Sequence, residues 1–283
     1  MTAWDPDLLK NPHAVADKRR RVQRMFAAIA PSYDLNNRLH SLWMDQRWRK
    51  RAAKLAELKP ADVVVDVACG TGDLTLAFYQ ALTTVICLTT RRIAIPAPNQ
   101  VIGIDFTFEM LPIARHKADA SEFMTYMGAI ANGVSPQDPI LFINGDAQAL
   151  PVPDTSADVA SIAFGIRNVA DPSVALREFH RILRPGGRVI ILEFSLPTNR
   201  LLRKIYNFYF RKILPRTATW ISGDKTGAYK YLPESVNTFI GREQMLTMMR
   251  EAGFERVEQF PMTFGVCVCY RGVVGDAALS VRD

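Results

Sequence analysis

The sequence predicts an α/β fold, a doubly wound and mostly parallel sheet of seven strands with an antiparallel strand near the C-terminus. Short apolar runs alternate with helical stretches along most of the chain. The run 63–67 breaks into the glycine turn Cys69-Gly-Thr-Gly, as a strand does before a helix. The last two runs are separated only by Pro261-Met262, too short for a crossover, so this pair should be antiparallel.

The elements are expected in alternating order from residue 63 onward. Each strand is an apolar run rich in Val, Ile or Phe, and each helix follows with apolar residues at helical spacing. The expected strands are 63–67, 101–105, 141–144, 159–164, 188–194, 254–260 and 263–270, and the expected helices are about 73–82, 108–119, 172–183, 200–212 and 241–252.

Two units are expected, an N-terminal helical part over 1–60 and a main domain over 61–283. Residues 1–17 resemble a loose arm, and 19–58 have a helical pattern broken once, at Pro31. The segment 81–100 is too long for a helix-to-strand connection, and its Pro-Ala-Pro indicates an inserted surface loop. A milder insertion is expected at 125–139.

Composition narrows the class of protein. With 283 residues, 48% of them hydrophobic, the chain can bury a large core. A net charge of +7 favours anionic partners. None of the four cysteines has metal-ligand spacing, so we expect no metal, reduced thiols and a cytoplasmic location. Neither a signal peptide nor an apolar run long enough to span a membrane is evident, and peripheral membrane contact stays open.

The glycine turn after the first strand indicates an adenosine-containing ligand at a helix N-terminus. The third glycine of a dinucleotide fingerprint is replaced by Thr75, and carboxylates flank the turn at Asp66 and Asp73. Carboxylates repel a pyrophosphate but attract the ammonium and sulfonium of S-adenosylmethionine (SAM). We therefore expect SAM here, with turn contacts from Asp66, Gly70, Thr71 and Gly72.

Two later strand ends supply further acids. Asp105 ends the second strand, where a carboxylate can accept hydrogen bonds from both ribose hydroxyls. Asp146 and Ala147 follow the third strand, and Asp146 is expected to take the adenine amino group. Either acid alone could be a helix cap or a turn residue. Acids at three successive strand ends favour the cofactor site.

Two long motifs, "YDLNNRLHSLWMDQRW" and "RILRPGGRVIILEFSLP", stand in order along the chain, with "FGIRNV", "YKYLPES" and "MMREAGFERVE" beside them. Through them the chain resembles the ubiquinone/menaquinone biosynthesis C-methyltransferase family over about residues 22–273. The two long motifs correspond to the two signatures of that family, and the three shorter ones have close counterparts in it. Asp45 stands where the family signature has histidine, and Ala163 where many members have serine. The resemblance implies a class I, Rossmann-like methyltransferase with residues 1–60 as a cap on the substrate side.

The resemblance also implies the reaction, which is carbon methylation of a polyprenyl quinol, from demethylmenaquinol to menaquinol or at the benzoquinol step of ubiquinone synthesis. The choice between the two rings and a possible homodimer stay open. Alternatives are a methyltransferase of the same fold acting on another small molecule or on RNA, and a non-enzymatic nucleotide-binding protein. The sequence has neither the Pro-Pro-aromatic motif of amine methyltransferases nor an RNA-binding module, so no nucleic-acid partner is expected.

Catalysis requires an ionised ring hydroxyl. With a phenol pKa near 10, ionisation at pH 7 costs about 4 kcal/mol, which a cation, donor or base in the site should offset. Arg167 and Asn168 follow the fourth strand and are the candidates. Pairing of Arg167 with Asp171 or Glu178 is an equally good interpretation. Tyr33, Tyr229 and Tyr231 are candidates for orienting the ring, although core packing is the favoured interpretation for any one of them. His180 and Glu193 are expected to be structural.

A polyprenyl tail would bring the enzyme to a membrane surface. Residues 199–216 combine six basic residues with aromatics at helical spacing. This pattern is typical of a helix on an anionic surface or of a lid over the active site, and the two interpretations are compatible. The run Lys18–Arg21 is expected to be a solvated helix face.

Overall fold

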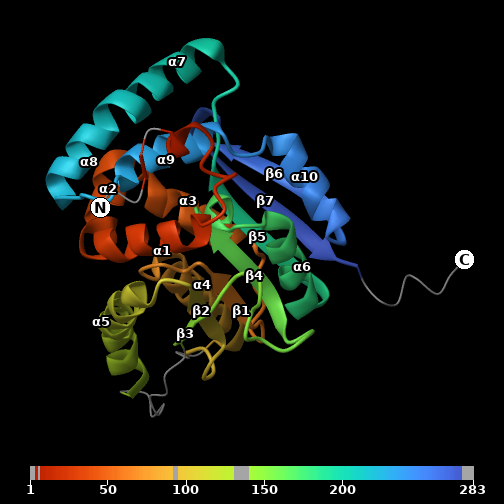
Figure 1. Cartoon of the computed structure of the whole chain (residues 1–283). Coiled ribbons are helices and arrows are strands. Elements are labelled where there is room, and N and C mark those ends of the chain that lie inside the picture. The colour runs from red at the N-terminus through yellow and green to blue at the C-terminus, as the bar shows by residue number, and fades with distance from the viewer. Residues whose placement is uncertain (1–3, 6, 92–94, 131–139, 276–283) are drawn as a thin grey trace, which may run out of the picture.

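A seven-stranded sheet with helices on both faces forms the centre of the computed structural model, which describes residues 4–5, 7–91, 95–130 and 140–275 (Figure 1). The strand order is β3-β2-β1-β4-β5-β7-β6. The strands are β1 (Val64–Val67), β2 (Val101–Asp105), β3 (Ile140–Asn144), β4 (Ala157–Ala163), β5 (Leu183–Phe194), β6 (Phe254–Met262) and β7 (Cys267–Val274). The first five pair in parallel, and β7 is antiparallel to both β5 and β6, so the expected fold class is confirmed.

Helices bury both faces of this sheet, which explains why its strands are continuous apolar runs. On one face α3 (Met44–Leu55) and α4 (Asp73–Thr90) pack on residues such as Ile190, and α5 (Leu111–Ile130) lies beside β3. On the other face α6 (Pro172–Ile182) and α10 (Arg242–Glu251) pack on residues such as Val189.

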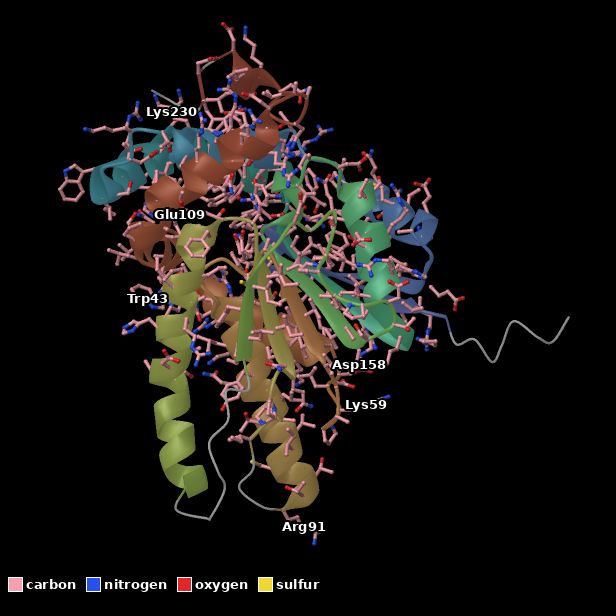
Figure 2. All side chains as sticks on the ribbon, turned by 60° about the horizontal axis from the view of Figure 1, so that its bottom comes forward. Trp43, Lys59, Arg91, Glu109, Asp158 and Lys230 are labelled. Atoms are coloured by element: carbon pink, nitrogen blue, oxygen red, sulfur yellow. The ribbon has the colours of Figure 1, made fainter. Side chains whose placement is uncertain are left out.

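A helical cap covers the carboxyl ends of the parallel strands. In Figure 2 Lys59, just before β1, lies at one end of the sheet, and Glu109, after β2, lies at the other, beside the cap. The cap combines the N-terminal helices with a later segment: α1 (Lys18–Ile29), η2 (Ala30–Ser32), α2 (Tyr33–Ser41), α7 (Arg200–Phe208), η5 (Tyr209–Ile213), α8 (Leu214–Ser222) and α9 (Ala228–Asn237). Trp4 in the expected loose arm is buried and stacks on Tyr231, with ring centroids 4.4 Å apart.

The structure differs from the sequence expectations at several connections. The segment 81–100, expected to be a loop, is helical through Thr90 as part of α4. Neither Gly nor Pro interrupts the helix there, and Leu82 and Ile86 continue its buried apolar stripe. Residues 125–130 of the second expected insertion continue α5; residues 92–94 and 131–139 lie outside the described residues.

Breaks and extensions also occur where local sequence gave no signal. The N-terminal helical segment breaks a second time at Leu42 and Trp43, both with positive φ, although left-handed backbone usually calls for glycine. The last hairpin turns at 263–266 instead of Pro261-Met262. Pro261 is accommodated in β6 because β6 is the edge strand. The helix α9 was not predicted, since it contains Pro233.

Candidate active site

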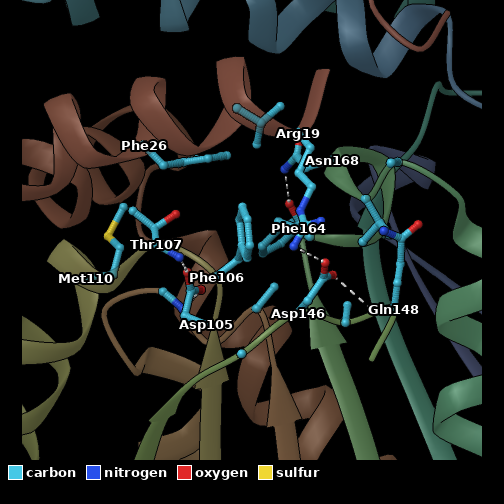
Figure 3. A pocket seen from close by; sticks show the side chains of 18 of the residues that line it. Arg19, Phe26, Asp105, Phe106, Thr107, Met110, Asp146, Gln148, Phe164 and Asn168 are labelled. Carbon is cyan, nitrogen blue, oxygen red and sulfur yellow. Dashed lines mark hydrogen bonds and ion pairs between the residues drawn. The ribbon is translucent and has the colours of Figure 1, made fainter. Parts of the chain in front are cut away.

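A first cavity, which we call the cofactor cavity, opens at the carboxyl ends of β1 and β4, where the strand order reverses. It takes in about 770 Å³ of space not filled by protein atoms, part of it open to solvent, and such a switch point is where open α/β sheets bind ligands. Its floor includes Gly70, Asp105, Asp146 and Ala147, and helix α1 covers it with Arg19, Val22 and Phe26 (Figure 3). Four residues expected from the sequence at a cofactor therefore line one cavity.

The glycine turn has the close backbone approach that its sequence implied. Gly70 has a φ of +55° and its N–H donates to Asp105 Oδ2 at 2.7 Å. Gly72 has a φ of +82°, and a Cβ there would lie 3.1 Å from the Cβ of Ala114. Glycine is thus required for both the backbone conformation and the packing of α4 against α5.

The two acids of the cofactor cavity are held by backbone donors. Asp105 is buried, which raises the pKa of its carboxyl group, and Oδ1 accepts from the N–H of Thr107 at 2.7 Å. Asp146 Oδ1 accepts from the N–H of Gln148 at 3.0 Å, and Oδ2 pairs with Arg19 Nη2 at 2.7 Å. Each carboxylate oxygen keeps a second lone pair that can accept from a ligand.

Three other expected cofactor residues lie behind the cavity wall. Asp66 is 0% exposed and accepts from the hydroxyls of Thr75 and Ser161, both at 2.7 Å. Burial raises the pKa of Asp66 to about 6. Thr71 donates to Asp34 Oδ1 at 2.5 Å, and Gly72 packs against α5. These residues shape the turn and do not line the cavity.

Asp73 is likewise occupied by protein partners. It pairs with Lys117 and, at 3.2 Å, with Arg38 Nη2, and Lys117 Nζ also binds Asp34 Oδ2 at 2.7 Å. Burial opposes ionisation of Asp73, but nearby Arg49 and Lys117 more than offset it and lower its pKa. The sequence argument placed the charges of Asp66 and Asp73 beside the ligand. In the structure Asp66 joins β1 to α4 and β4, and Asp73 ties the turn to the cap and to α5.

A second cavity, which we call the ring cavity, adjoins the first. It takes in about 890 Å³ of space not filled by protein atoms, part of it open to solvent. Phe26, Tyr33 and Phe164 line both cavities. Most of the other lining residues come from the cap. Seven of them, some from α3 and β5, are aromatic: Trp48, Phe194, Tyr206, Tyr209, Phe210, Tyr229 and Tyr231. The two cavities therefore adjoin at three shared aromatic side chains.

Arg167 lines the ring cavity and is fixed by a buried partner. Its Nη1 donates to Glu193 Oε1 at 2.5 Å and to the carbonyl oxygen of Phe164 at 2.7 Å. Neither alternative partner applies, because Asp171 caps α6 and Glu178 pairs with Arg181. Glu193 therefore belongs to the site in addition to its place in β5.

Asn168 lines the cofactor cavity and has both ends of its amide engaged. Its Nδ2 donates to the carbonyl oxygen of Phe164 at 3.2 Å, and its Oδ1 accepts from the hydroxyl of Tyr231 at 2.9 Å. Asn168 thus helps to fix the segment that carries Phe164, which has a φ of +56°.

Sequence reasoning missed a buried ion pair in the ring cavity. Arg49 Nη1 donates to Asp45 Oδ2 at 2.8 Å, and the Arg49 guanidinium carbon lies 5.2 Å from the centre of the Phe164 ring. Asp45 also accepts from Ser41 and Gln46, both at 2.9 Å. An acid and an arginine four residues apart on a helix were the available signal.

The ring cavity also contains a buried hydroxyl without a partner. Among the described residues, Tyr206 Oη has no hydrogen-bond partner, and burial raises its pKa, so it stays protonated as a donor. Within the same part of the chain, no hydrogen bond is formed by Nη2 of Arg49 or of Arg167. These donors are available to oxygen atoms of a ligand.

The basic run Lys18–Arg21 is solvated only in part, as Arg19 and Arg20 are exposed but Lys18 is not. Lys18 is buried and donates to the carbonyl oxygens of Arg167, at 2.9 Å, and Val169, at 2.6 Å. Burial and the nearby charge of Arg167 lower the pKa of Lys18 to about 8. Lys18 therefore attaches α1 to the site, and Arg19 lines the cofactor cavity.

Known proteins resemble this chain over most of its length. Residues 14–274 match the profile of the ubiE/COQ5 methyltransferase family. A ubiquinone/menaquinone biosynthesis C-methyltransferase UbiE from Geobacter sp. (strain M21) is 40% identical over 92% of this chain and 99% of the relative. A demethylmenaquinone methyltransferase from Thermus thermophilus is 42% identical over 88% of this chain and 99% of the relative.

Solved structures share the fold at low identity. A chain from the complex between the Haloferax volcanii Trm112 methyltransferase activator and a putative methyltransferase matches with a TM-score of 0.56 and 19% identity, over 88% of this chain and 97% of that chain. A possible exported protein from Bordetella parapertussis matches with a TM-score of 0.54 and 17% identity, over 83% and 68%.

Proposed function

We propose, given that the chain belongs to the ubiE/COQ5 methyltransferase family, that it transfers a methyl group from SAM to a ring carbon of a polyprenyl quinol in menaquinone or ubiquinone biosynthesis. The observation that carries the proposal is the wall of Phe26, Tyr33 and Phe164 shared by two cavities. One cavity suits an adenosine-containing donor, and the other suits an aromatic acceptor.

The cofactor cavity has the chemistry that SAM requires. Asp105 would accept hydrogen bonds from the ribose hydroxyls, and Asp146 with Ala147 would hold the adenine. Gly70 leaves open space where a side chain would stand, since no atom lies within 4 Å of the position of a Cβ there. SAM supplies an electrophilic methyl group when bound.

The ring cavity supplies what a quinol needs to become a carbon nucleophile. Arg49 and Arg167 would donate from Nη2 to the ring oxygens and favour the ionised hydroxyl, and Tyr206 would donate a third hydrogen bond. Phenolate formation releases the hydroxyl proton. The ring carbon would then form its bond to the methyl group as the bond from that methyl group to sulfur breaks, and the sulfur would leave as the neutral thioether. Loss of the proton on that ring carbon to water would restore the aromatic ring, and the ring oxygen would take back a proton, so one proton is released overall.

The partners of these arginines act as positioning residues in this proposal. Asp45 accepts from three donor groups, which makes it a firm anchor for Arg49. Glu193 holds Arg167 in the same way. Tyr33, in the shared wall, would set the plane of the ring against the methyl donor.

The tail of the substrate determines where the enzyme works. Each buried CH₂ group contributes about 0.8 kcal/mol, so removing a whole polyprenyl tail from a bilayer is prohibitive. We therefore propose a cytoplasmic enzyme that contacts the membrane surface transiently while the tail stays in the lipid.

The test measures cofactor binding and turnover separately. Calorimetric titration should show saturable binding of SAM and none of NAD. Reduced demethylmenaquinone, or the corresponding demethylated benzoquinol, should then gain one methyl group by mass spectrometry. SAM binding without methylation of either quinol would reject the proposed acceptor, and absent SAM binding would reject the proposed cofactor site.

A further inference from the structure

Helix α7 has an apolar face that the protein leaves uncovered. None of its nine residues is buried. Leu201, Leu202, Ile205 and Phe208 are 66%, 37%, 58% and 63% exposed. Leu201, Ile205 and Phe208 follow the i, i+4, i+7 spacing and form one stripe. Figure 1 shows α7 at the outer edge of the cap, away from the sheet. An apolar stripe of this kind indicates a binding surface.

The charged residues around this stripe are all basic. Residues 199–223 contain six Lys or Arg and neither Asp nor Glu. Arg200, Arg203 and Lys204 on α7 are exposed, as are Lys212 and Arg216 farther along, while Arg211 pairs with Glu234 at 2.5 Å. Helical geometry places Lys204 beside the stripe, between Leu201 and Phe208.

The same helix also closes the ring cavity. Tyr206 points its side chain into that cavity, and Tyr209 and Phe210 follow in η5, a π-helix. Tyr209 donates to the carbonyl oxygen of His40 at 3.1 Å, which joins this segment to α2. One side of the α7–η5 segment therefore faces the ring site, and the other side presents the apolar stripe to the surroundings.

We propose that the outward face of α7 docks on a bilayer rich in anionic lipid, with the apolar stripe among the acyl chains and the cations at the headgroups. This inference rests on the proposed function, because docking there places the ring cavity next to the lipid that holds the tail. Charge complementarity selects this occupant. A second copy of the chain would bring the same cations face to face. No helix within the described ranges is long and apolar enough to cross a membrane.

The experiment measures vesicle binding of the full chain by flotation. One set of vesicles is phosphatidylcholine, and the other is phosphatidylcholine with an equal amount of phosphatidylglycerol. The double variant Ile205→Asp/Phe208→Asp should bind the anionic vesicles at least about a hundredfold more weakly, because two apolar side chains that would insert among the acyl chains are replaced by carboxylates. Leu88→Asp is the matched control: Leu88 is 75% exposed on α4, whose end at Arg91 lies far from the cap (Figure 2). Its binding should change less than about twofold.

A second variant leaves the apolar stripe intact. Lys204→Gln/Lys212→Gln should weaken binding to anionic vesicles by about twentyfold and leave the weaker binding to neutral vesicles unchanged. Methylation of a quinol with one isoprene unit, assayed in detergent, should be unaffected in both variants. Methylation of a long-tailed quinol in anionic vesicles should fall with binding.

Three results would overturn docking by α7. The first is vesicle binding that is unchanged in both variants. The second is wild-type binding that shows no preference for anionic vesicles. The third is a wild-type protein that binds no vesicles and forms a dimer, which the double substitution disrupts. If the wild-type protein methylated neither quinol, the proposed function would be rejected instead. The flotation result would still decide whether α7 docks, since it requires no turnover.

Discussion

Replacing Asp66 by asparagine should stabilise the protein at neutral pH and leave cofactor binding intact. Asp66 is fully buried, and burial raises its pKa from 3.8 to about 6. A rise of about two pKa units corresponds to about 3 kcal/mol at 1.36 kcal/mol per unit. That free energy is the cost, in the folded state, of keeping this carboxylate ionised above pH 6.

The sign follows from proton binding. Between pH 3.8 and about 6 the folded protein keeps a proton on Asp66 that the unfolded chain has lost. The contribution of this group to the free energy of unfolding therefore falls as pH rises through that window. Asp66→Asn removes the cost of the charge but weakens one hydrogen bond to Thr75 or Ser161, worth about 1 kcal/mol. The variant should be about 2 kcal/mol more stable than wild type at about pH 7.5 and slightly less stable at about pH 4.

Urea unfolding of wild type and variant across this pH range gives the difference in their free energies of unfolding directly, because the other titrating groups are common to both proteins. Calorimetry should find that the affinities of the two proteins for SAM agree within about threefold, since Asp66 does not line the cofactor cavity. A difference in stability that stays constant with pH would refute the electrostatic argument. Loss of SAM binding in a stable variant would restore the direct contact that the sequence suggested.

Further predictions concern side chains that line the two cavities or hold them in place. Asp105→Asn should weaken SAM binding by more than about tenfold in calorimetry, and an affinity equal to that of the exposed control Asp119→Asn would contradict the ribose role. Arg49→Gln should lower kcat for quinol methylation by about a hundredfold with SAM affinity unchanged. The control Arg47→Gln, on the same helix but exposed, should leave kcat unchanged. Equal kcat values for the two variants would exclude Arg49 from the ring site. Glu193→Gln should lower the urea-derived free energy of unfolding by about 3 kcal/mol, because it leaves the buried guanidinium of Arg167 uncompensated, and a change below about 1 kcal/mol would contradict a tight buried pair.

The sheet and the floor of the cofactor cavity were predictable because their signals are local. Strands buried on both faces appear as uninterrupted apolar runs, and the carboxyl ends of parallel strands meet at one edge. Asp105 and Asp146 could therefore be assigned to one cavity from their positions after apolar runs. The antiparallel hairpin followed from the shortness of its connection.

The structure of the cap and the pairing of charged side chains could not be predicted in this way. The break at Leu42 and Trp43 puts two exposed residues other than glycine in left-handed backbone, for which the local sequence carries no signal. Pairing of Asp73 with Lys117 joins residues 44 positions apart, and pairing of Arg167 with Glu193 joins residues 26 apart. Such partners have no signature in local sequence, so acids that look available to a ligand can already be neutralised by the protein.

The most direct test of the account is the position of the transferred methyl group. The enzyme would be incubated with SAM carrying a ¹³C-labelled methyl group and with reduced demethylmenaquinone, and the product examined by NMR. Two cavities that meet at Phe26, Tyr33 and Phe164, with donors held on the ring oxygens, predict a single signal from a methyl group bonded to a ring carbon. A signal from a methyl ether would contradict the account, and so would a quinol that carries no label on a ring carbon or on an oxygen.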